Sequence, residues 1–348
     1  MRTSQSRRQG IDLIRSVSIL YIVGFWHLLG YAPAIDGYKN DLTSRLTLVV
    51  LGLFLFISGH LIGQSSSLSA RGWRSIPEFY KRRLIRIYPP YLLALLLFEL
   101  CGLLERGQLL PAVFLVSSLV GNHLKTLWFV EVLMVFYLLA PFLLLLQRST
   151  GAEASRLKGA ALLVMLIGTS VLLSRWLPHW DPRLFFYFPA FATGLISATW
   201  PSTTPMGGPL RKRISTLTCI IPACIAAVVV SFGHGDLNEQ NLAIFPLALF
   251  GPWALFLLVN SFEKRLQLPG YLLQLSLSSY FLYLFHRPVY WAFTSLVSPS
   301  GAVLQLIYLL VVCLPAAITT AWLGQRLYDR LLGQFRGFRH RSRVEDSP

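Results

Sequence analysis

Four ionisable side chains stand inside long apolar runs of the chain, where membrane-spanning helices are expected. They are His27, Glu131, His286 and Arg287. A charged group inside a membrane costs several kcal/mol unless it is paired, so each marks a candidate functional site. Counting along the expected helices places all four at a similar depth, near the outer side. A structural network explains one such residue easily and four together less well, so the group is interpreted as a candidate acid–base cluster.

A second group of candidates lies toward the cytoplasmic side. Arg82, Arg83 and Arg86 precede an apolar run and share a helical face, a spacing that could hold phosphate groups. An ordinary basic flank that contacts anionic headgroups fits the same residues. Asp12 and Arg15 stand three residues apart near this side, where a local ion pair is the simplest interpretation.

Ser58 and Gly59 lie near the inner end of the second apolar run at a similar depth, followed by His60 as an extra candidate. Gly59 would permit two helix backbones to approach closely. The helical rise puts roughly 15–20 Å between the inner basic group and the outer acid–base group. A membrane enzyme that takes an anionic donor from the cytoplasm would need this arrangement.

The elements that position these residues follow from composition. Of the 348 residues, 54% are hydrophobic and only 13% are charged, about half the charge density of a soluble protein. This excludes a soluble enzyme and a disordered chain, and it predicts an all-α polytopic integral membrane protein. Apolar runs of roughly 20 residues predict ten transmembrane helices, at residues 11–30, 46–64, 87–104, 127–147, 159–177, 184–200, 215–232, 241–260, 271–292 and 303–325. A shorter run, residues 109–120, suits an interfacial or re-entrant segment.

The net charge of +16 is interpreted as a topology signal. With the N-terminus in the cytoplasm, most of the 31 basic residues fall on the inner side. Both termini are therefore predicted to be cytoplasmic, and a nucleic-acid partner is not expected. The predicted organisation is a cytoplasmic segment at 1–10, a transmembrane domain at 11–325 and a basic cytoplasmic tail at 326–348. The four cysteines show no paired spacing, so no disulfide or metal framework is expected.

Five segments, in order along the chain, resemble signatures of the membrane-bound acyltransferase-3 family. They are the segment from Gly10 to Arg15 followed by His27, then FLFISGHLI at 54–62, FYKRRLIRIYP at 79–89, LWFVE at 127–131 with Phe136 and Tyr137, and SYFLYLFHRP at 279–288. The chain is identified by them as a member of this family, which transfers acyl groups to cell-surface sugars and other hydroxylated acceptors. Ten spans with an inside N-terminus also fit the family.

One departure concerns the first signature. The family usually has ten residues between the arginine and the histidine, whereas eleven separate Arg15 from His27. Ten intervening residues would place the pair roughly 20° apart around a helix, and eleven place it about 120° apart. A one-residue bulge would restore the alignment, and Gly24 is the expected place for it. Without a bulge, Trp26 occupies the aligned position.

The resemblance implies an O-acyltransferase that moves an acyl group, expected to be acetyl, from acyl-CoA in the cytoplasm to a hydroxyl of a carbohydrate or glycan. His27 would act as general base, because an imidazole titrates near neutral pH, and Glu131 would orient it. His286 and Arg287 would line the acceptor site or stabilise an oxyanion. The donor-binding candidates are Arg15, Arg82, Arg83 and Arg86, and the substrate or supporting candidates are Asp12, Ser58, Trp128, Tyr283, His286 and Arg287.

No permanently bound cofactor or metal is expected, since acetyl-CoA or another acyl-CoA serves as donor substrate. The expected partners are acyl-CoA, a glycan acceptor and membrane lipid, and the expected location is the bacterial cytoplasmic (inner) membrane; no oligomeric state is predicted. Direct transfer and a transient acyl-histidine both fit the residues, as do acetyl and succinyl groups. A transporter or flippase of a saccharide or lipid-linked substrate is the alternative function, although no clear inverted repeat supports it.

Overall fold

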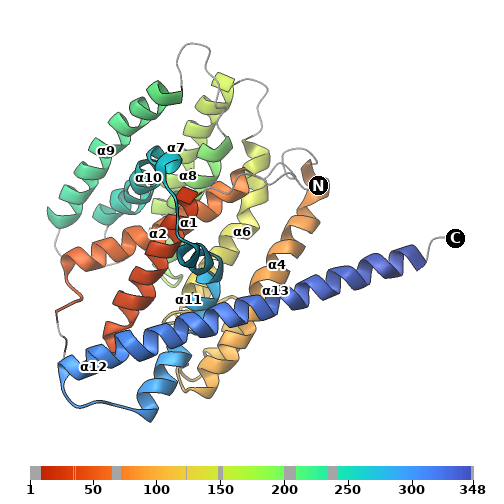
Figure 1. Cartoon of the computed structure of the whole chain (residues 1–348). Coiled ribbons are helices and arrows are strands. Elements are labelled where there is room, and N and C mark those ends of the chain that lie inside the picture. Colours follow the sequence, from red (N-terminus) through yellow and green to blue (C-terminus); the bar gives the residue numbers. More distant parts are fainter. Residues whose placement is uncertain are drawn as a thin grey trace. The chain divides into compact units, whose positions relative to one another are not determined.

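A computed structural model of the chain describes residues 9–33, 35, 37–64, 72–122, 124–147, 152–199, 209–233 and 242–345. The regular elements in these residues are all helical, with no strand among them, which confirms the all-α class (Figure 1). Each of the ten apolar runs expected from the sequence coincides with helical structure.

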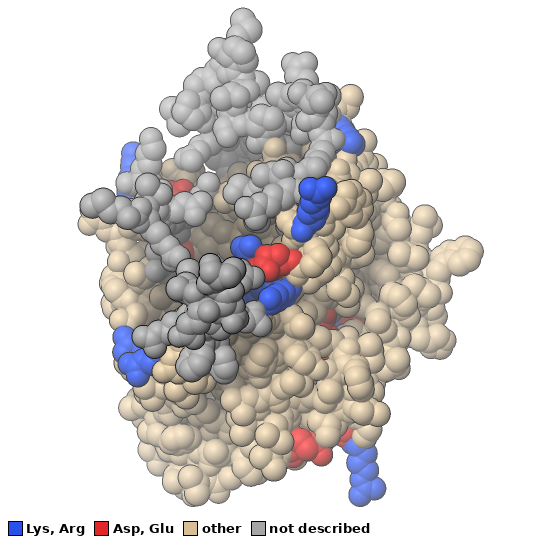
Figure 2. All heavy atoms as spheres, turned by 90° about the vertical axis from the view of Figure 1, so that its right-hand side faces the viewer, with Lys and Arg blue, Asp and Glu red and all other residues tan. Residues whose placement is uncertain are grey.

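Five helical stretches are long and apolar enough to cross a membrane: Gln9–Tyr31, Asp41–Gly63, Trp128–Leu146, Leu157–Trp176 and Ala302–Gln334. Large apolar side chains stand exposed on them, among them Val164 at 71% and Trp176 at 81%. The face drawn in Figure 2 consists mainly of residues other than Lys, Arg, Asp and Glu. A surface of this kind is stable in contact with lipid tails. The number of ten spans and the side on which each terminus lies stay predictions.

The chain forms two compact units. Unit 1 contains residues up to Ile14 and from Gly37 to Leu266, and unit 2 contains Arg15–Asp36 and the residues from Gln267 onward. The helices of unit 1 are α2 (Asp41–Gly63), α4 (Ile76–Leu100), α5 (Leu109–Val113), α6 (Trp128–Leu146), α7 (Ala152–Trp176), α8 (Pro182–Thr199), α9 (Pro209–Gly233) and α10 (Phe245–Ser261), with 3₁₀ turns at η3 (Gly72–Ser75), η4 (Ser117–Leu119), η5 (Leu242–Ile244) and η6 (Glu263–Arg265). The boundary between the units falls inside α1 (Gln9–Tyr21).

Helix α8 is the centre of unit 1, because it packs against α2, α6, α7 and α10. Its contact with α2 depends on glycines. A Cβ on Gly59 would meet the carbonyl oxygen of Phe191, and one on Gly194 would meet that of Phe56. Gly63 likewise lies against the backbone of α8. Two backbones can touch in this way only where no side chain intervenes, so the close approach expected at Gly59 is confirmed.

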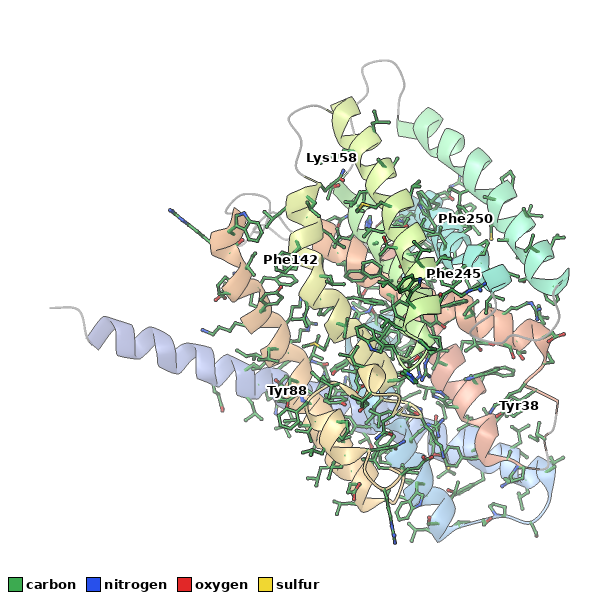
Figure 3. The ribbon with its side chains drawn as sticks, turned by 180° about the vertical axis from the view of Figure 1, so that it is seen from behind. Tyr38, Tyr88, Phe142, Lys158, Phe245 and Phe250 are labelled. Carbon is green, nitrogen blue, oxygen red and sulfur yellow. The ribbon has the colours of Figure 1, made fainter. Side chains whose placement is uncertain are left out.

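Aromatic side chains join the helices of unit 1, and Figure 3 labels Tyr88 of α4 and Phe245 of α10 among them. Phe245, at the start of α10, lies edge-on to Phe186 of α8 with ring centroids 4.9 Å apart. Tyr88 of α4 donates a hydrogen bond to the carbonyl of Val113 at 2.8 Å. The segment 109–120 contains the five-residue helix α5, which packs against α4, and the 3₁₀ turn η4, which packs against α6. Neither element is long enough to span a membrane, as the sequence predicts.

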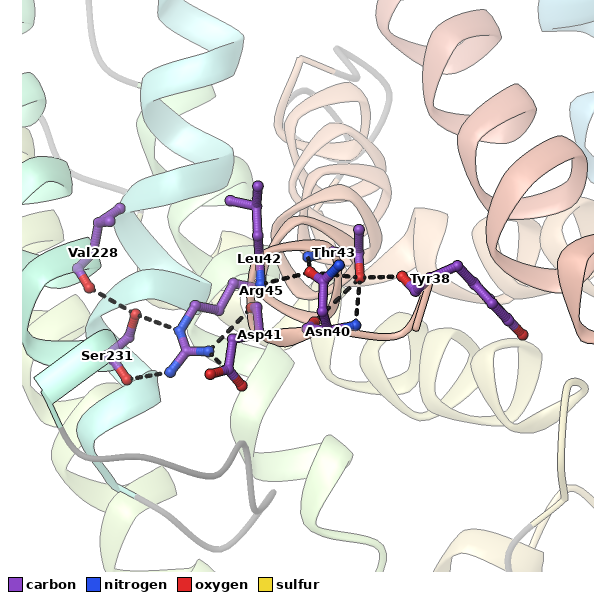
Figure 4. Close-up of polar contacts among 8 residues, drawn as sticks. All are labelled: Tyr38, Asn40, Asp41, Leu42, Thr43, Arg45, Val228 and Ser231. Atoms are coloured by element: carbon purple, nitrogen blue, oxygen red, sulfur yellow. Dashed lines mark hydrogen bonds and ion pairs between the residues drawn. The ribbon is translucent and has the colours of Figure 1, made fainter. Parts of the chain in front are cut away.

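Helix α2 begins earlier than the predicted span, which starts at residue 46. Asn40 caps it, because its side chain accepts hydrogen bonds from the N–H groups of Leu42 and Thr43 (Figure 4). The extra turns carry Arg45, which is only 3% exposed. Its guanidinium donates to the side chain and the carbonyl of Ser231 on α9, and it lies 3.4 Å from the carboxylate of Asp41. A buried arginine thus joins α2 to α9.

Unit 2 is organised around α11 (Gly270–Leu296). This helix packs against α13 (Leu314–Glu345) and against two π-helical turns, η1 (Ile22–His27) and η7 (Leu309–Cys313). The short elements η2 (Leu29–Tyr31) and α12 (Ala302–Tyr308) adjoin these turns. Helix α13 continues without a break through residue 326, where the basic tail is predicted to begin.

Candidate active site

The first helix contains the bulge that the spacing predicts. After α1 ends at Tyr21, the next six residues form the π-helical turn η1, from Ile22 to His27, with Gly24 inside it. A π-turn accommodates one extra residue without interrupting the helix. The eleven residues between Arg15 and His27 therefore act as ten, and the two side chains stand on nearly the same face. The prediction of a one-residue bulge at Gly24 is confirmed.

His27 is held by a second histidine from α11. Its Nδ1 atom lies 2.8 Å from Nε2 of His286, and the two ring planes differ by only 2°. His286 is completely buried, whereas His27 is partly exposed. Nδ1 of His286 lies 2.8 Å from the carbonyl oxygen of Tyr283 and 3.1 Å from that of Leu282. The structure thus joins two histidines that the sequence placed only at a similar depth.

Helix α11 also supports the π-turn itself. The hydroxyl of Tyr290 donates a hydrogen bond to the carbonyl oxygen of Val23, inside η1, at 3.2 Å. The ring of Tyr290 lies edge-on to that of His286, with centroids 5.6 Å apart. Tyr290 was not among the residues predicted from the sequence, since an aromatic residue in an apolar run carries no distinguishing signal.

Arg15 contacts the same helix two turns earlier. One of its terminal nitrogens donates to the hydroxyl of Ser279 at 3.1 Å. Ser279 and His286 are seven residues apart on α11, so they share a face and are separated by roughly 10 Å along it. Tyr283 lies between them, with its ring 6.1 Å from that of His286. Arg15, Tyr283 and the two histidines therefore form one group in unit 2.

Arg287 belongs to unit 2 as well and is partly buried. Its Nε atom is buried and has no hydrogen-bond partner among the residues that the structure describes. Buried polar atoms are nearly always hydrogen-bonded, so an unpaired guanidinium nitrogen next to His286 is unusual. It is suited to donate to an oxygen atom of a ligand.

Glu131 lies in unit 1 and is completely buried in the first turn of α6. One carboxylate oxygen accepts hydrogen bonds from the N–H of Ser118 at 3.0 Å and from its hydroxyl at 2.8 Å. The other oxygen lies 3.4 Å from the hydroxyl of Tyr91. Glu131 therefore fixes the irregular segment that contains Ser118 and Leu115, the latter with a positive φ of 59°. Since Glu131 and His27 belong to different units, the orientation of His27 by Glu131 stays a prediction.

The ring of Trp128, one turn before Glu131, packs against an ion pair. The guanidinium of Arg183 lies 4.2 Å from the centroid of the Trp128 ring and binds the carboxylate of the fully buried Asp181 through two nitrogens. The N–H of Asp181 donates to the carbonyl of Ser118 at 2.7 Å. This pair was not predicted, although an aspartate two residues before an arginine at a helix start is a recognisable signal.

The inner basic group lies in the first turns of α4. Arg82 is exposed and bonded to Glu78 at 2.9 Å, whereas Arg83 lies against the rings of Phe79 and Tyr137. Arg86 is exposed and makes no ion pair with a described residue. The three arginines therefore differ, and Arg86 is the one best suited to bind an anion.

Two further candidates lie in unit 1. Ser58 is partly buried on α2, and Asp12 is 7% exposed in α1. Because the unit boundary follows Ile14, the pairing of Asp12 with Arg15 stays a prediction. His60 is enclosed by the rings of Phe56 and Phe256 and lies 2.7 Å from the side-chain nitrogen of Gln64.

A family model described as an acyltransferase domain matches residues 8–325, nearly the whole chain. The chain belongs to the acyltransferase-3 family. No curated protein and no solved structure matches it. The family and the exposed apolar helices together indicate that this chain is a multi-pass membrane acyltransferase. The identification from the five sequence segments is confirmed.

The acyltransferase-3 chain holds no cluster of three or more metal-ligating side chains within the residues that the structure describes. Its cysteines Cys101, Cys224 and Cys313 are unpaired thiols within apolar helices or at their ends. The candidate groups in the described part of this acyltransferase-3 chain are imidazoles, guanidinium groups and buried carboxylates, among them Glu131. These groups suit proton transfer and the binding of anions.

Proposed function

We propose that this chain is a membrane O-acyltransferase that moves an acetyl group from acetyl-CoA to a hydroxyl of a carbohydrate acceptor. The observation that carries the proposal is the geometry of His27. A π-turn directs this partly exposed histidine against His286, which holds its ring in a fixed plane. A fixed imidazole in a membrane acyltransferase is suited to remove a proton from a hydroxyl.

In the proposed step His27 takes the proton of the acceptor hydroxyl. The hydroxyl oxygen forms a bond to the thioester carbonyl carbon, and the carbon–sulfur bond breaks. The thiolate of CoA leaves and takes up the proton from His27, so the base is restored. A route through an acyl-imidazole on His27 uses the same residue and produces the same products.

The remaining candidates have roles that their surroundings support. Arg86, with Arg82 and Arg83, would bind the phosphates of the donor from the cytoplasmic side. Arg287 would donate from its unpaired Nε atom to the carbonyl oxygen of the acyl group as negative charge develops there. Tyr283 lies on the same face of α11 as His286, and Arg15 of α1 contacts this face through Ser279; both would contact the acyl-bearing arm of the donor. The bacterial cytoplasmic membrane is the proposed location.

The test uses purified protein in detergent, radiolabelled acetyl-CoA and a glycan fraction from the expression host, with empty-vector membranes as the blank. The wild type is expected to label the glycan and release free CoA thiol. His27→Ala should lose both, whereas His179→Leu, which removes an exposed histidine, should retain both. Full transfer by a well-folded His27→Ala protein would refute the role of His27. After reconstitution of the same protein into lipid vesicles, glycan movement across the bilayer without release of CoA thiol would indicate the transporter instead.

Labelling of the protein separates the two chemical routes. If an acyl-imidazole forms, label from acetyl-CoA remains on the wild-type protein when no acceptor is added, and His27→Ala does not become labelled. Direct transfer predicts no labelled protein under these conditions.

A further inference from the structure

The two histidines of unit 2 fix each other's protons. Nδ1 of His286 faces the carbonyl oxygens of Tyr283 and Leu282 at 2.8 and 3.1 Å. A carbonyl oxygen can only accept a hydrogen bond, so Nδ1 of His286 must carry a hydrogen atom. In a neutral imidazole the other nitrogen then has the lone pair. That nitrogen, Nε2 of His286, is the one that faces His27.

The proton of His27 follows from this constraint. Its Nδ1 atom lies 2.8 Å from Nε2 of His286, a distance at which one nitrogen donates and the other accepts. When both rings are neutral, Nε2 of His286 accepts and Nδ1 of His27 donates. The lone pair of His27 must then be on Nε2. The ring planes, which differ by 2°, align this N–H with the lone pair that receives it.

We propose that His286 is the positioning residue that holds His27 in the Nδ1–H tautomer, so that Nε2 of His27 is the base that removes the acceptor proton. The proposal rests on the proposed function and deepens it, since it assigns the basic atom and the group that selects it. His286 itself is 0% exposed, so in this proposal it acts through His27 and not by contact with the substrate.

The same contact stabilises the charge that develops during the reaction. When Nε2 of His27 takes a proton, the positive charge of its ring is shared through the Nδ1–H bond with His286. The two carbonyls at Nδ1 of His286 face that charge with their negative ends. A carboxylate often has this role next to a catalytic histidine. Here a neutral ring backed by two carbonyl dipoles occupies the corresponding place.

Other parts of unit 2 maintain the pair. Tyr290 contacts His286 with its ring and Val23 of the π-turn with its hydroxyl, so one residue of α11 connects both halves of the arrangement. The Cβ that Gly24 lacks would lie 3.3 Å from a methyl group of Leu314. The position of His27 is therefore determined by packing on more than one side of its turn.

The tautomer can be measured without any acyl transfer. Protein labelled with ¹⁵N in its histidine rings is studied by NMR in detergent micelles, where nitrogen shifts and N–H couplings separate protonated from bare ring nitrogens. The signals of His27 are assigned by their loss in His27→Ala. We expect a hydrogen on Nδ1 and none on Nε2. A hydrogen on Nε2 of wild-type His27 would overturn the proposal.

Two substitutions at His286 provide the functional test. Glutamine can place an accepting oxygen near the position of Nε2, so His286→Gln should keep the Nδ1–H signal of His27 and most of the activity. His286→Leu removes the acceptor, so the hydrogen of His27 should move to Nε2 and kcat should fall about 100-fold with KM for the donor unchanged. His179→Leu serves as the matched control.

The outcomes distinguish this proposal from the proposed function. Full activity of His286→Leu, with wild-type unfolding temperature and elution volume, would overturn the positioning role. An equal loss of activity in His286→Gln and His286→Leu, with the His27 signals unchanged in both, would also overturn it. A wild type that transfers no acyl group but shows the expected tautomer would refute the proposed function and support the positioning of His27.

Discussion

Removing one residue from the π-turn should leave most of the activity, whereas adding one residue to it should remove most of the activity. Deletion of Gly24 converts η1 into an ordinary helical turn, because the turn contains one residue more than an α-helix requires. The angle around the helix axis between Arg15 and His27 is then unchanged. Insertion of an alanine after Gly24 adds a second extra residue. A single π-turn accommodates only one, so the inserted residue rotates His27 around the helix axis.

The magnitude follows from helix geometry. One residue rotates everything beyond it by about 100°, and a side chain about 5–6 Å from the helix axis then moves by roughly 8 Å. The hydrogen bond between His27 and His286 is 2.8 Å long and cannot survive such a displacement. We therefore expect the insertion to lower kcat at least about 100-fold, the usual contribution of a general base. The deletion should stay within about tenfold of the wild type, since the base is kept.

The assay is acyl transfer from radiolabelled acetyl-CoA by purified protein, with unfolding temperature and elution volume as checks of folding. In the deletion variant, substitution of the histidine that corresponds to His27 should abolish the remaining activity. If both variants fold and show equal activity, the argument from helical phase is refuted.

Four further substitutions test other contacts. Gly59→Ala places a Cβ against a backbone carbonyl of α8 and should lower the free energy of unfolding by about 1–3 kcal/mol, whereas Gly168→Ala, which meets nothing within 4 Å, should not; thermal unfolding in detergent measures both. Arg45→Met leaves acceptors on α9 unpaired and should cost about 1–3 kcal/mol in the same assay, so an unchanged unfolding temperature would show that this buried contact is unimportant. Arg86→Ala should raise KM for acetyl-CoA with little change in kcat. An unchanged KM for acetyl-CoA would show that Arg86 does not bind the donor and serves only to orient the chain in the membrane. Glu131→Gln keeps an accepting oxygen and should be milder than Glu131→Ala, as judged by unfolding temperature and transfer activity together.

Local helix geometry explains what could be predicted from the sequence. The number of residues between Arg15 and His27 determines an angle, and an angle that is wrong by one residue requires a bulge, which the structure has at Gly24. The close approach at Gly59 was predictable for a similar reason, because the absence of a side chain is visible in the sequence. Both features depend on a few neighbouring residues.

Partners from distant helices could not be predicted. His27 and His286 are 259 residues apart, and Arg45 and Ser231 are 186 residues apart. A common depth in the membrane does not say which faces of two helices meet, so the sequence placed His286 near the acceptor and did not pair it with His27. The contact between Glu131 and Ser118 was missed for a different reason, since Ser118 lies in an irregular segment without periodicity.

The glycine contact between α2 and α8 also has a consequence for biosynthesis. About 130 residues separate Gly59 from Gly194, and a ribosome adds roughly 5–20 residues per second. Helix α2 therefore stays in the membrane for on the order of ten seconds before α8 has been made. During this interval its glycine face is open to any neighbouring helix that offers a small residue. During this period the glycine face of α2 has no α8 to pack against. Correct folding then depends on α2 not packing against another helix first.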